Sequence, residues 1–379
     1  MKILHLSIND IRNDTRTIKQ IYSAEKNGHS VKAICFKLKK KIKKTKLIDY
    51  KKIKLVKPIY YNLFFINKFL YKIYTLLYSN FMFVKFGIKI NPDLIHCSDY
   101  HPLFSATIIK LFCGSKIIYD AHELESQTTN LNKIYSKMVY FYEKLHWPFI
   151  DGFITVSPSI LKWYKKFFKK KNSILTVNSP LILKHSKKND YLKNKYKIKK
   201  NKKLFLYIGK LGNNRGIDLI LKSFSSNSIK SHVVFMGHGF NKMKILKKYE
   251  KKNNNIHFHS AVSAEQMDSI IASADYGLCL IDPNSSLSDK YCLPNKFFEY
   301  VFSGIPVISS NLKDVVALLK KYNLGTFIEY NSTSLINQIK LLDKKKINFS
   351  KKNLSRINYL NWKNQSNNML NLYNKLYKS

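Results

Sequence analysis

Short apolar strands alternate with helices along the chain, and this alternation restricts the fold more than any other feature. Lys2 to Ser7 reads as a strand, a helix follows and stops at Gly28, and residues 29–35 read as a second strand. Strand, helix and strand with short connections make a parallel βαβ unit. The alternation stops in the lysine-rich residues 181–203 and starts again at Leu204. We therefore predict an α/β chain with two domains, residues 1–182 and 183–361, for which 379 residues suffice.

The segment from Ser288 to Ser309 reads SDKYCLPNKFFEYVFSGIPVIS and is the strongest candidate for a binding site. Pro294 suits the first turn of a helix, Gly304 suits its end, and a buried strand follows. Apolar side chains at helical spacing form one face of this predicted helix. They are Phe297, Phe298, Val301 and Phe302.

The opposite face of the same helix carries Asn295, Lys296 and Glu299, three and four positions apart, so that their side chains can converge. A helix N-terminus that is entered from a loop carrying Lys290 attracts phosphate. We hypothesise that this helix holds the diphosphate and ribose of an activated sugar. Glu299 suits ribose hydroxyls better than phosphate, because a carboxylate repels an anion; the alternative is a solvent-exposed helix glutamate.

Two glycine turns follow strands of the second half. Gly209 is followed by Lys210 and, after a short loop, by Arg215, while Gly237 and Gly239 end the next strand. Glycine lets the backbone approach an anion closely, and arginine can bind phosphate through two N–H groups. The loop after the first strand of the chain lacks G-x-G-x-x-G, which disfavours a dinucleotide-binding domain of that type.

In the first half, His122 follows a strand and lies beside Glu123 and Glu125. A histidine at this place can bind a sugar hydroxyl or shuttle a proton; the alternative is a histidine that only packs. No acidic pair or histidine–cysteine cluster with metal-ligand spacing accompanies these residues, so we expect neither a metal site nor a cofactor.

The formal net charge is +44, which favours nucleic acid, anionic lipid or nucleotide sugars as partners, unless it reflects a lysine-rich genome. No nucleic-acid-binding module is recognisable, so we expect no nucleic acid partner. Residues 60–86 mix aromatic, aliphatic and lysine side chains at helical spacing. This pattern is typical of helices that dock on an anionic membrane, although an ordinary helix covering the first sheet would also explain it.

Thiols and the N-terminus indicate the compartment. The cysteines are scattered without a CxxC pair, which predicts reduced thiols in a cytosol. The first residues read as a strand rather than a signal peptide, and no apolar run is long enough to span a bilayer. We therefore expect a soluble or peripheral cytoplasmic protein. The five cysteines are Cys35, Cys97, Cys113, Cys279 and Cys292.

Taken together, motifs along almost the whole chain resemble the retaining glycosyltransferases of family GT4, which have the GT-B fold. The resemblance implies two Rossmann-like α/β/α domains that face a central cleft, with the acceptor on the first domain and the donor on the second. It also implies that the last helix, residues 362–379, packs back on the first domain. The matching motifs are the loop with Asp14 and Arg16, residues 119–123 (YDAHE), 151–157 (DGFITVS), 178–180 (NSP), 207–209 (YIG), Arg215-Gly216, 237–239 (GHG), 293–300 (LPNKFFEY) and 304–307 (GIPV).

The resemblance also assigns roles. His122 would contact the donor sugar, Arg215 and a lysine would bind the diphosphate, and Glu299 would bind the ribose. Tyr291 stands where the family has a first signature glutamate, and Lys210 where many members have arginine. The predicted catalytic residues are His122, Arg215, Lys290 and Glu299; the predicted donor-binding residues are Gly209, Lys210, Arg215, Gly237, Gly239, Tyr291, Leu293, Asn295, Lys296 and Glu299.

The resemblance implies a metal-independent hexosyltransferase that retains the anomeric configuration by front-face transfer. Its donor would be a UDP- or GDP-sugar and its acceptor a glycan or lipid-linked saccharide of cell-surface polysaccharide synthesis, at the inner face of the cytoplasmic membrane. Two alternatives stay open: a sugar-nucleotide epimerase of the same fold, and a non-enzymatic polyanion-binding protein.

Overall fold

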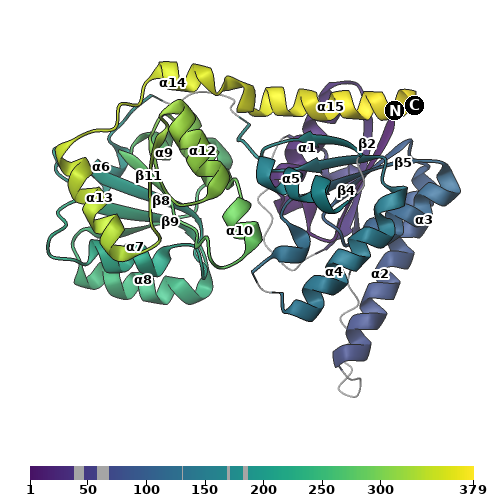
Figure 1. The fold of residues 1–379 in the computed structure, drawn as a ribbon, viewed down its shortest axis with the longest axis horizontal. Coiled ribbons are helices and arrows are strands. Elements are labelled where there is room, and N and C mark those ends of the chain that lie inside the picture. Colours follow the sequence, from purple (N-terminus) through teal and green to yellow (C-terminus); the bar gives the residue numbers. More distant parts are fainter. Residues whose placement is uncertain (38–46, 58–67, 130, 169–170, 182–186) are drawn as a thin grey trace. The chain divides into compact units, whose positions relative to one another are not determined.

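The computed structural model describes the chain except residues 38–46, 58–67, 130, 169–170 and 182–186 (Figure 1). Its internal contacts divide the chain into two units. The N-terminal unit contains Met1–Thr176 and Gln365–Ser379, and the C-terminal unit contains Val177–Asn364. The predicted boundary between residues 182 and 183 lies outside the described residues.

A seven-stranded parallel sheet in the order β3-β2-β1-β4-β5-β6-β7 forms the centre of the N-terminal unit. The order reverses between β1 and β4, and open parallel sheets bind ligands beyond the carboxyl ends of the strands at such a point. The strands are β1 (Lys2–Ser7), β2 (Ser30–Phe36), β3 (Ile53–Val56), β4 (Leu94–Ser98), β5 (Lys116–Ala121), β6 (Gly152–Thr155) and β7 (Asn172–Leu175). The α-helices between them are α1 (Thr15–Lys26), α2 (Lys68–Ile90), α3 (Leu103–Cys113), α4 (Lys133–His146) and α5 (Pro158–Phe167).

A six-stranded parallel sheet in the order β10-β9-β8-β11-β12-β13 forms the centre of the C-terminal unit, and its order reverses between β8 and β11. The two parallel sheets confirm the predicted α/β class. The strands are β8 (Leu204–Lys210), β9 (His232–His238), β10 (Ile256–Ser260), β11 (Tyr276–Cys279), β12 (Val307–Ser310) and β13 (Gly325–Ile328). The helices are α6 (Tyr191–Lys195), α7 (Ile217–Phe224), α8 (Phe240–Lys252), α9 (Ala264–Ala272), α10 (Leu287–Tyr291), α11 (Asn295–Phe302), α12 (Lys313–Tyr322), α13 (Ser332–Lys344) and α14 (Lys351–Arg356).

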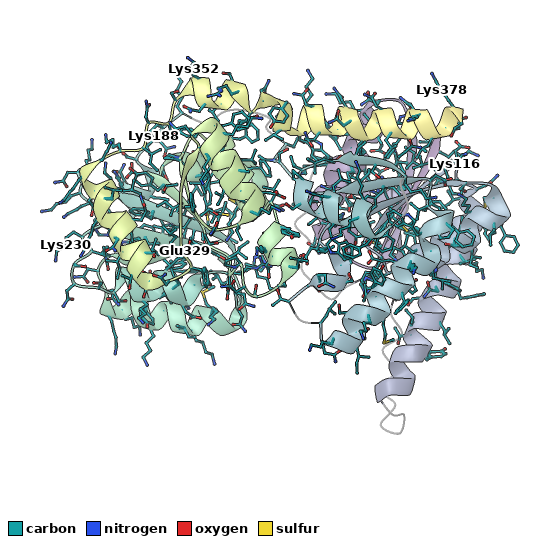
Figure 2. The ribbon with its side chains drawn as sticks, in the orientation of Figure 1. Lys116, Lys188, Lys230, Glu329, Lys352 and Lys378 are labelled. Carbon is teal, nitrogen blue, oxygen red and sulfur yellow. The ribbon has the colours of Figure 1, made fainter. Side chains whose placement is uncertain are left out.

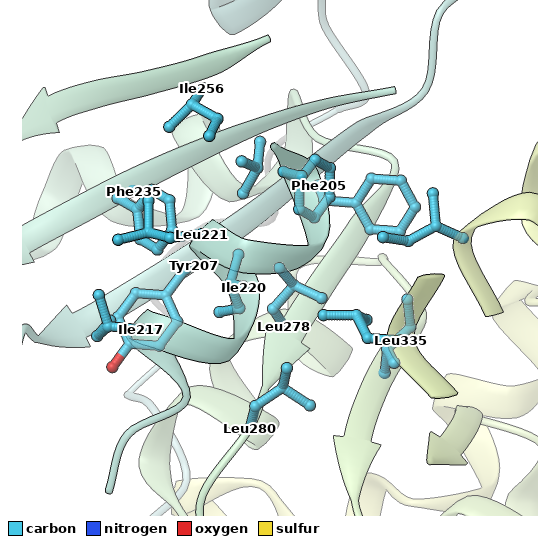
Figure 3. Packing of buried hydrophobic residues seen from close by; sticks show 14 of the residues in the cluster. Phe205, Tyr207, Ile217, Ile220, Leu221, Phe235, Ile256, Leu278, Leu280 and Leu335 are labelled. Atoms are coloured by element: carbon cyan, nitrogen blue, oxygen red, sulfur yellow. The ribbon is translucent and has the colours of Figure 1, made fainter. Parts of the chain in front are cut away.

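Strand β8 lies in the middle of the core of the C-terminal unit (Figure 3). Its residues Leu204 to Ile208 are all buried, as expected of a parallel strand covered on both faces. Phe205 and Tyr207 pack on Ile220 and Leu221 of α7 in this core. The core therefore fixes β8 and α7, and with them the loop that joins the two elements.

The last helix, α15 (Trp362–Lys378), contributes Met369, Tyr373 and Leu376 to the core of the N-terminal unit. A Cβ atom at Gly152 would lie 2.8 Å from the Cδ1 atom of Leu376. Glycine at this position of β6 thus allows the helix to approach the sheet closely.

Exposed lysines are spread over both units: Lys188, Lys230 and Lys352 lie on the C-terminal unit and Lys378 on the N-terminal unit (Figure 2). Of the segment predicted to dock on a membrane, residues 60–67 lie outside the described residues and the rest belongs to α2. None of the helices in the described ranges is both long and apolar enough to cross a bilayer.

Candidate functional site

Two glycines meet at the carboxyl ends of β8 and β9. Gly209 and Gly237 are opposite one another in the register of these strands. A Cβ atom on Gly237 would stand 1.8 Å from the carbonyl oxygen of Gly209, and one on Gly239 would stand 2.2 Å from that of Leu211. Because neither position has room for a side chain, an anion can approach the main chain at this edge of the sheet.

The loop after β8 brings Arg215 to the end of β11. Gly216 begins α7 with a φ of +74°, and a Cβ atom there would lie 2.6 Å from the Cβ atom of Leu280. The N–H group of Asp282 donates a hydrogen bond of 3.1 Å to the carbonyl oxygen of Asn214. The loop is thus fixed at both of its neighbours, and Arg215 is presented where the strand order reverses.

Asp289 orients Arg215, and the sequence did not single it out. Nη1 of Arg215 lies 3.5 Å from Oδ1 of Asp289, whose other oxygen accepts hydrogen bonds from the hydroxyls of Ser285 (2.8 Å) and Ser286 (3.2 Å). The two partners are 74 residues apart, so no local pattern links them. The expected loop around Lys290 is instead helix α10, with Lys290 exposed at its end. Ser286 explains the difference, because it caps this helix by accepting a bond from the N–H group of Asp289.

Tyr300 anchors helix α11 to the sheet. Its hydroxyl donates a hydrogen bond of 2.9 Å to the carbonyl oxygen of Leu206 and accepts one of 2.8 Å from the N–H group of Ile208. Only glycine fits beneath its ring, since a Cβ atom at Gly277 would lie 2.3 Å from the ring. Pro294 is the N-cap of the helix rather than part of its first turn. This anchor positions the other face of α11, which carries the predicted binding residues.

Lys296 is the most unusual residue on that face. Its ammonium nitrogen is buried and has no hydrogen-bond partner in the described part of the chain. It lies 4.1 Å from the centre of the Tyr207 ring, whose hydroxyl bonds to the carbonyl oxygen of Lys210. Burial lowers the pKa of Lys296 to about 8, and Arg215 lowers it further against the opposite influence of Glu299. A buried, unpaired ammonium is costly and is relieved by a bound anion.

The remaining predicted residues of the C-terminal unit vary in exposure. Glu299 is half-buried, whereas Lys210 and Asn295 are exposed and Leu293 is buried. The ring of Tyr291 lies 5.2 Å from the ammonium group of Lys313. The position of the first signature glutamate thus holds an aromatic ring that faces a cation.

In the N-terminal unit, Asp120 binds several side chains at the carboxyl end of β5. Arg16 donates two hydrogen bonds to its two oxygens, at 3.0 and 2.7 Å, and Gln20 donates one of 2.7 Å. His96 and His122 approach the same carboxylate with their Nε2 atoms at 3.3 and 3.2 Å. Although burial opposes it, Arg16 holds the pKa of Asp120 well below its usual value. Asp120 is therefore ionised, and it draws the surrounding side chains into one arrangement.

His122 lies between two carboxylates. Its Nδ1 atom is 3.4 Å from Asp99 and its Nε2 atom is 3.2 Å from Asp120. Burial alone would lower the pKa of His122, but Asp99 and Asp120 outweigh it and raise the pKa to about 9. At neutral pH this side chain is an imidazolium, which donates hydrogen bonds and cannot accept a proton.

The C-terminal unit therefore brings Arg215, Lys296 and Glu299 together beside glycine-rich backbone, whereas His122 belongs to the other unit. No group of three or more potential metal-ligating side chains occurs within the described ranges.

Comparisons with known proteins agree with this organisation. A family model described as "Glycosyl transferases group 1" matches residues 188–358, and one described as "Glycosyltransferase Family 4" matches residues 22–179. No curated protein sequence matches the chain.

Several solved structures are similar to this fold along its whole length. Sucrose-phosphate synthase from Thermosynechococcus elongatus has a TM-score of 0.79 at 14% identity, covering 100% of this chain and 99% of that one. HepE from Anabaena, solved with UDP-glucose, has a TM-score of 0.71 at 11% identity, covering 100% of both chains. A glycosyltransferase from Rickettsia africae has a TM-score of 0.68 at 14% identity, covering 100% of this chain and 99% of that one.

The two family models fall largely on different units and together span most of the chain. Their combination matches the two parallel sheets and the similar structures. The chain therefore belongs to the GT4-like group 1 glycosyltransferases and has their GT-B fold of two Rossmann-like domains.

Proposed function

We propose that this glycosyltransferase binds a nucleotide sugar, UDP- or GDP-linked, on its C-terminal unit and transfers the sugar with retention of configuration. The observation that carries the proposal is the buried ammonium of Lys296, which has no hydrogen-bond partner within the described residues. A diphosphate supplies the acceptor oxygens that this group lacks. The guanidinium of Arg215 is 37% exposed, so it keeps N–H groups for the same anion. HepE, which is similar in fold, was solved with UDP-glucose and supports the choice of donor class.

The chemistry follows from the charges. In the proposed step the bond between the anomeric carbon and the phosphate oxygen breaks, and the acceptor oxygen bonds to the same face of that carbon. The acceptor proton passes to the leaving phosphate oxygen. Lys296 and Arg215 stabilise the diphosphate as its charge develops, which makes a metal ion unnecessary. Glu299 accepts hydrogen bonds from the ribose hydroxyls. The contact to the donor sugar that the family implies for His122 needs a hydrogen-bond donor, and an imidazolium is one.

For the acceptor we propose a glycan or lipid-linked saccharide of cell-surface polysaccharide synthesis, reached from the cytoplasmic side of the membrane. The basic composition supports this choice, because lipid-linked saccharides are held in anionic membranes.

A thermal-shift screen against UDP-, GDP-, ADP- and CMP-sugars tests the donor. A ligand that binds only the folded state raises the melting temperature, and we expect a UDP- or GDP-sugar to do so in the wild type but not in Arg215→Ala. Incubation of the selected donor with and without acceptor then tests the reaction. An isomer of the donor formed without acceptor would identify an epimerase instead, and no shift with any sugar nucleotide would contradict the proposal.

A further inference from the structure

Exposed apolar side chains are concentrated on three consecutive helices of the N-terminal unit. Of the 18 large apolar side chains exposed in the described part of the chain, 12 lie on α2, α3 and α4. The described residues of the C-terminal unit expose four: Tyr191, Ile245, Leu341 and Tyr359. Solvent-facing residues of a surface helix are normally polar, so this concentration indicates a surface that is covered.

The exposed side chains form stripes rather than scattered points. Helix α4 exposes Ile134, Met138, Phe141 and Leu145, which follow one another at intervals of four, three and four residues. This is the spacing of one helix face, and here that face points away from the core. Its members are 58–72% exposed. Helix α2 repeats the pattern with Tyr74, Leu77 and Phe81, and helix α3 adds Phe104, Leu111 and Phe112.

The three helices form one layer (Figure 1). The hydroxyl of Ser105 in α3 donates a hydrogen bond of 2.6 Å to the side chain of Asn80 in α2. The N–H group of Phe104 in α3 donates one of 3.2 Å to the hydroxyl of Tyr142 in α4. The stripes therefore belong to one continuous face, which we call the α2–α4 face.

The charges on these helices are almost all of one sign. Their sequences contain one acidic residue, Glu143, which is buried and bonded to two tyrosines. The basic residues include the exposed lysines Lys85, Lys89, Lys133, Lys137 and Lys144. Apolar stripes between lysines are suited to the interface of an anionic bilayer, where apolar side chains enter the acyl region and lysines reach the headgroups.

A pocket of about 230 Å³ lies behind α2, at the carboxyl ends of β1, β2 and β4. It is contained in the N-terminal unit, and its lining includes Ile8 after β1, Phe36 at the end of β2 and His101 after β4. The strand order of the sheet reverses here, which is where open parallel sheets bind ligands. Leu76, which is 57% exposed, also lines the pocket and connects it to the α2–α4 face.

The pocket is mainly apolar but contains three unused polar atoms. The hydroxyl oxygens of Thr75 and Ser79 and the Nδ1 atom of His101 are buried and lack hydrogen-bond partners within the described residues. A cavity lined only by apolar groups would need no such atoms, and buried polar groups normally have partners. An apolar chain with an ester, hydroxyl or phosphate oxygen at one end would satisfy both features.

We propose that the α2–α4 face docks on an anionic lipid surface and that the pocket takes up part of a lipid from it. For the identity of that lipid as the acceptor, the inference rests on the glycosyl transfer proposed above. The docking itself does not depend on it.

Co-sedimentation with vesicles tests the docking. We expect the wild type to bind vesicles of phosphatidylcholine mixed with phosphatidylglycerol, to bind phosphatidylcholine alone weakly, and to dissociate at high salt. The variant Leu77→Ser/Phe81→Ser should bind the mixed vesicles about tenfold or more weakly, because two large apolar side chains no longer enter the bilayer. Lys133→Glu/Lys137→Glu should also weaken binding and reduce its salt dependence. Ile245→Ser/Leu341→Ser, on the C-terminal unit, is the matched control and should bind like the wild type.

Decyl phosphate is the probe for the pocket. It should raise the melting temperature of the wild type but not of Ser79→Leu, whose larger side chain fills the pocket, while Ser79→Leu still binds the mixed vesicles. Equal binding of the wild type and the α2–α4 variants to vesicles would overturn the docking proposal. So would a change from dimer to monomer in the α2–α4 variants without any loss of vesicle binding, because the face would then cover a second copy of the chain. A melting-temperature increase with UDP in the same variants tests the donor proposal separately.

Discussion

His122 of the N-terminal unit and Lys296 of the C-terminal unit are both half-buried cations beside a parallel sheet, yet their surroundings differ. His122 lies within 3.4 Å of two carboxylates, which raise its pKa to about 9. The ammonium of Lys296 faces an aromatic ring and has no hydrogen-bond partner in the part of the chain that the structure describes. Its pKa falls to about 8 because burial penalises the charge. A paired cation stabilises its unit, whereas an unpaired cation costs stability and is available to a ligand.

The largest effect should follow the loss of the paired charge system. Asp120→Asn removes the carboxylate that Arg16 binds with two hydrogen bonds and leaves the guanidinium buried without its partner. We expect the free energy of unfolding of the N-terminal unit to fall by about 3–5 kcal/mol. Urea unfolding measures this. Glu25→Gln, which removes the exposed ion pair with Lys52, is the control and should cost less than about 1 kcal/mol. Equal losses in the two variants would show that the buried system has no special weight.

Loss of the unpaired charge should affect binding rather than folding. Lys296→Met should weaken UDP binding about 10- to 100-fold, the range expected for a charge-assisted hydrogen bond, and leave the unfolding free energy unchanged or higher. Lys290→Met removes an exposed lysine of the same segment and is the matched comparison. Titration calorimetry with UDP decides between them. A larger loss in Lys290→Met would move the phosphate site from α11 to α10.

The two cations should also give opposite responses to pH. The pKa of His122 is higher in the folded than in the unfolded state, so its stabilisation is complete below about pH 6.5 and is lost as pH rises through about 9. The pKa of Lys296 is lower in the folded state. The unfolded state therefore binds more protons between about pH 8 and 10.5, and stability rises across that range.

Melting curves of the wild type, His122→Gln and Lys296→Met over pH 6–10.5 separate these two contributions, each worth about 1.4 kcal/mol per unit of pKa difference. Subtracting each variant from the wild type should give slopes of opposite sign. Slopes of the same sign would mean that one of the two cations is held differently from this description.

The smallest effect concerns a second lysine above a ring. Lys313 lies 5.2 Å from the ring of Tyr291 but is exposed, unlike the ammonium of Lys296 over Tyr207. Lys313→Ala should cost about 0.5–1 kcal/mol of unfolding free energy and change UDP affinity by less than about threefold. Calorimetry on this variant shows whether the position of the first signature glutamate takes part in donor binding.

The sequence predicted the features that depend on local pattern. Apolar strands alternating with helices gave both parallel sheets, and the motifs from Tyr119 to Val307 led to the family. The contacts that orient the candidate residues were not predictable, because they join residues far apart in the chain: 104 positions for Arg16 and Asp120, and 74 for Arg215 and Asp289. The outward stripe of α4 has a readable helical spacing, but spacing alone does not tell whether an apolar face points to the core or to solvent.

Proton uptake on nucleotide binding tests most directly the claim that Lys296 is an unpaired cation awaiting a diphosphate. A diphosphate raises the pKa of the ammonium, so near pH 8 the protein should take up about half a proton per bound UDP. Titration calorimetry in buffers of different ionisation enthalpy measures this number, and it should vanish in both Lys296→Met and Lys296→Arg. The same uptake in Lys296→Met as in the wild type, or no uptake in the wild type, would contradict the account.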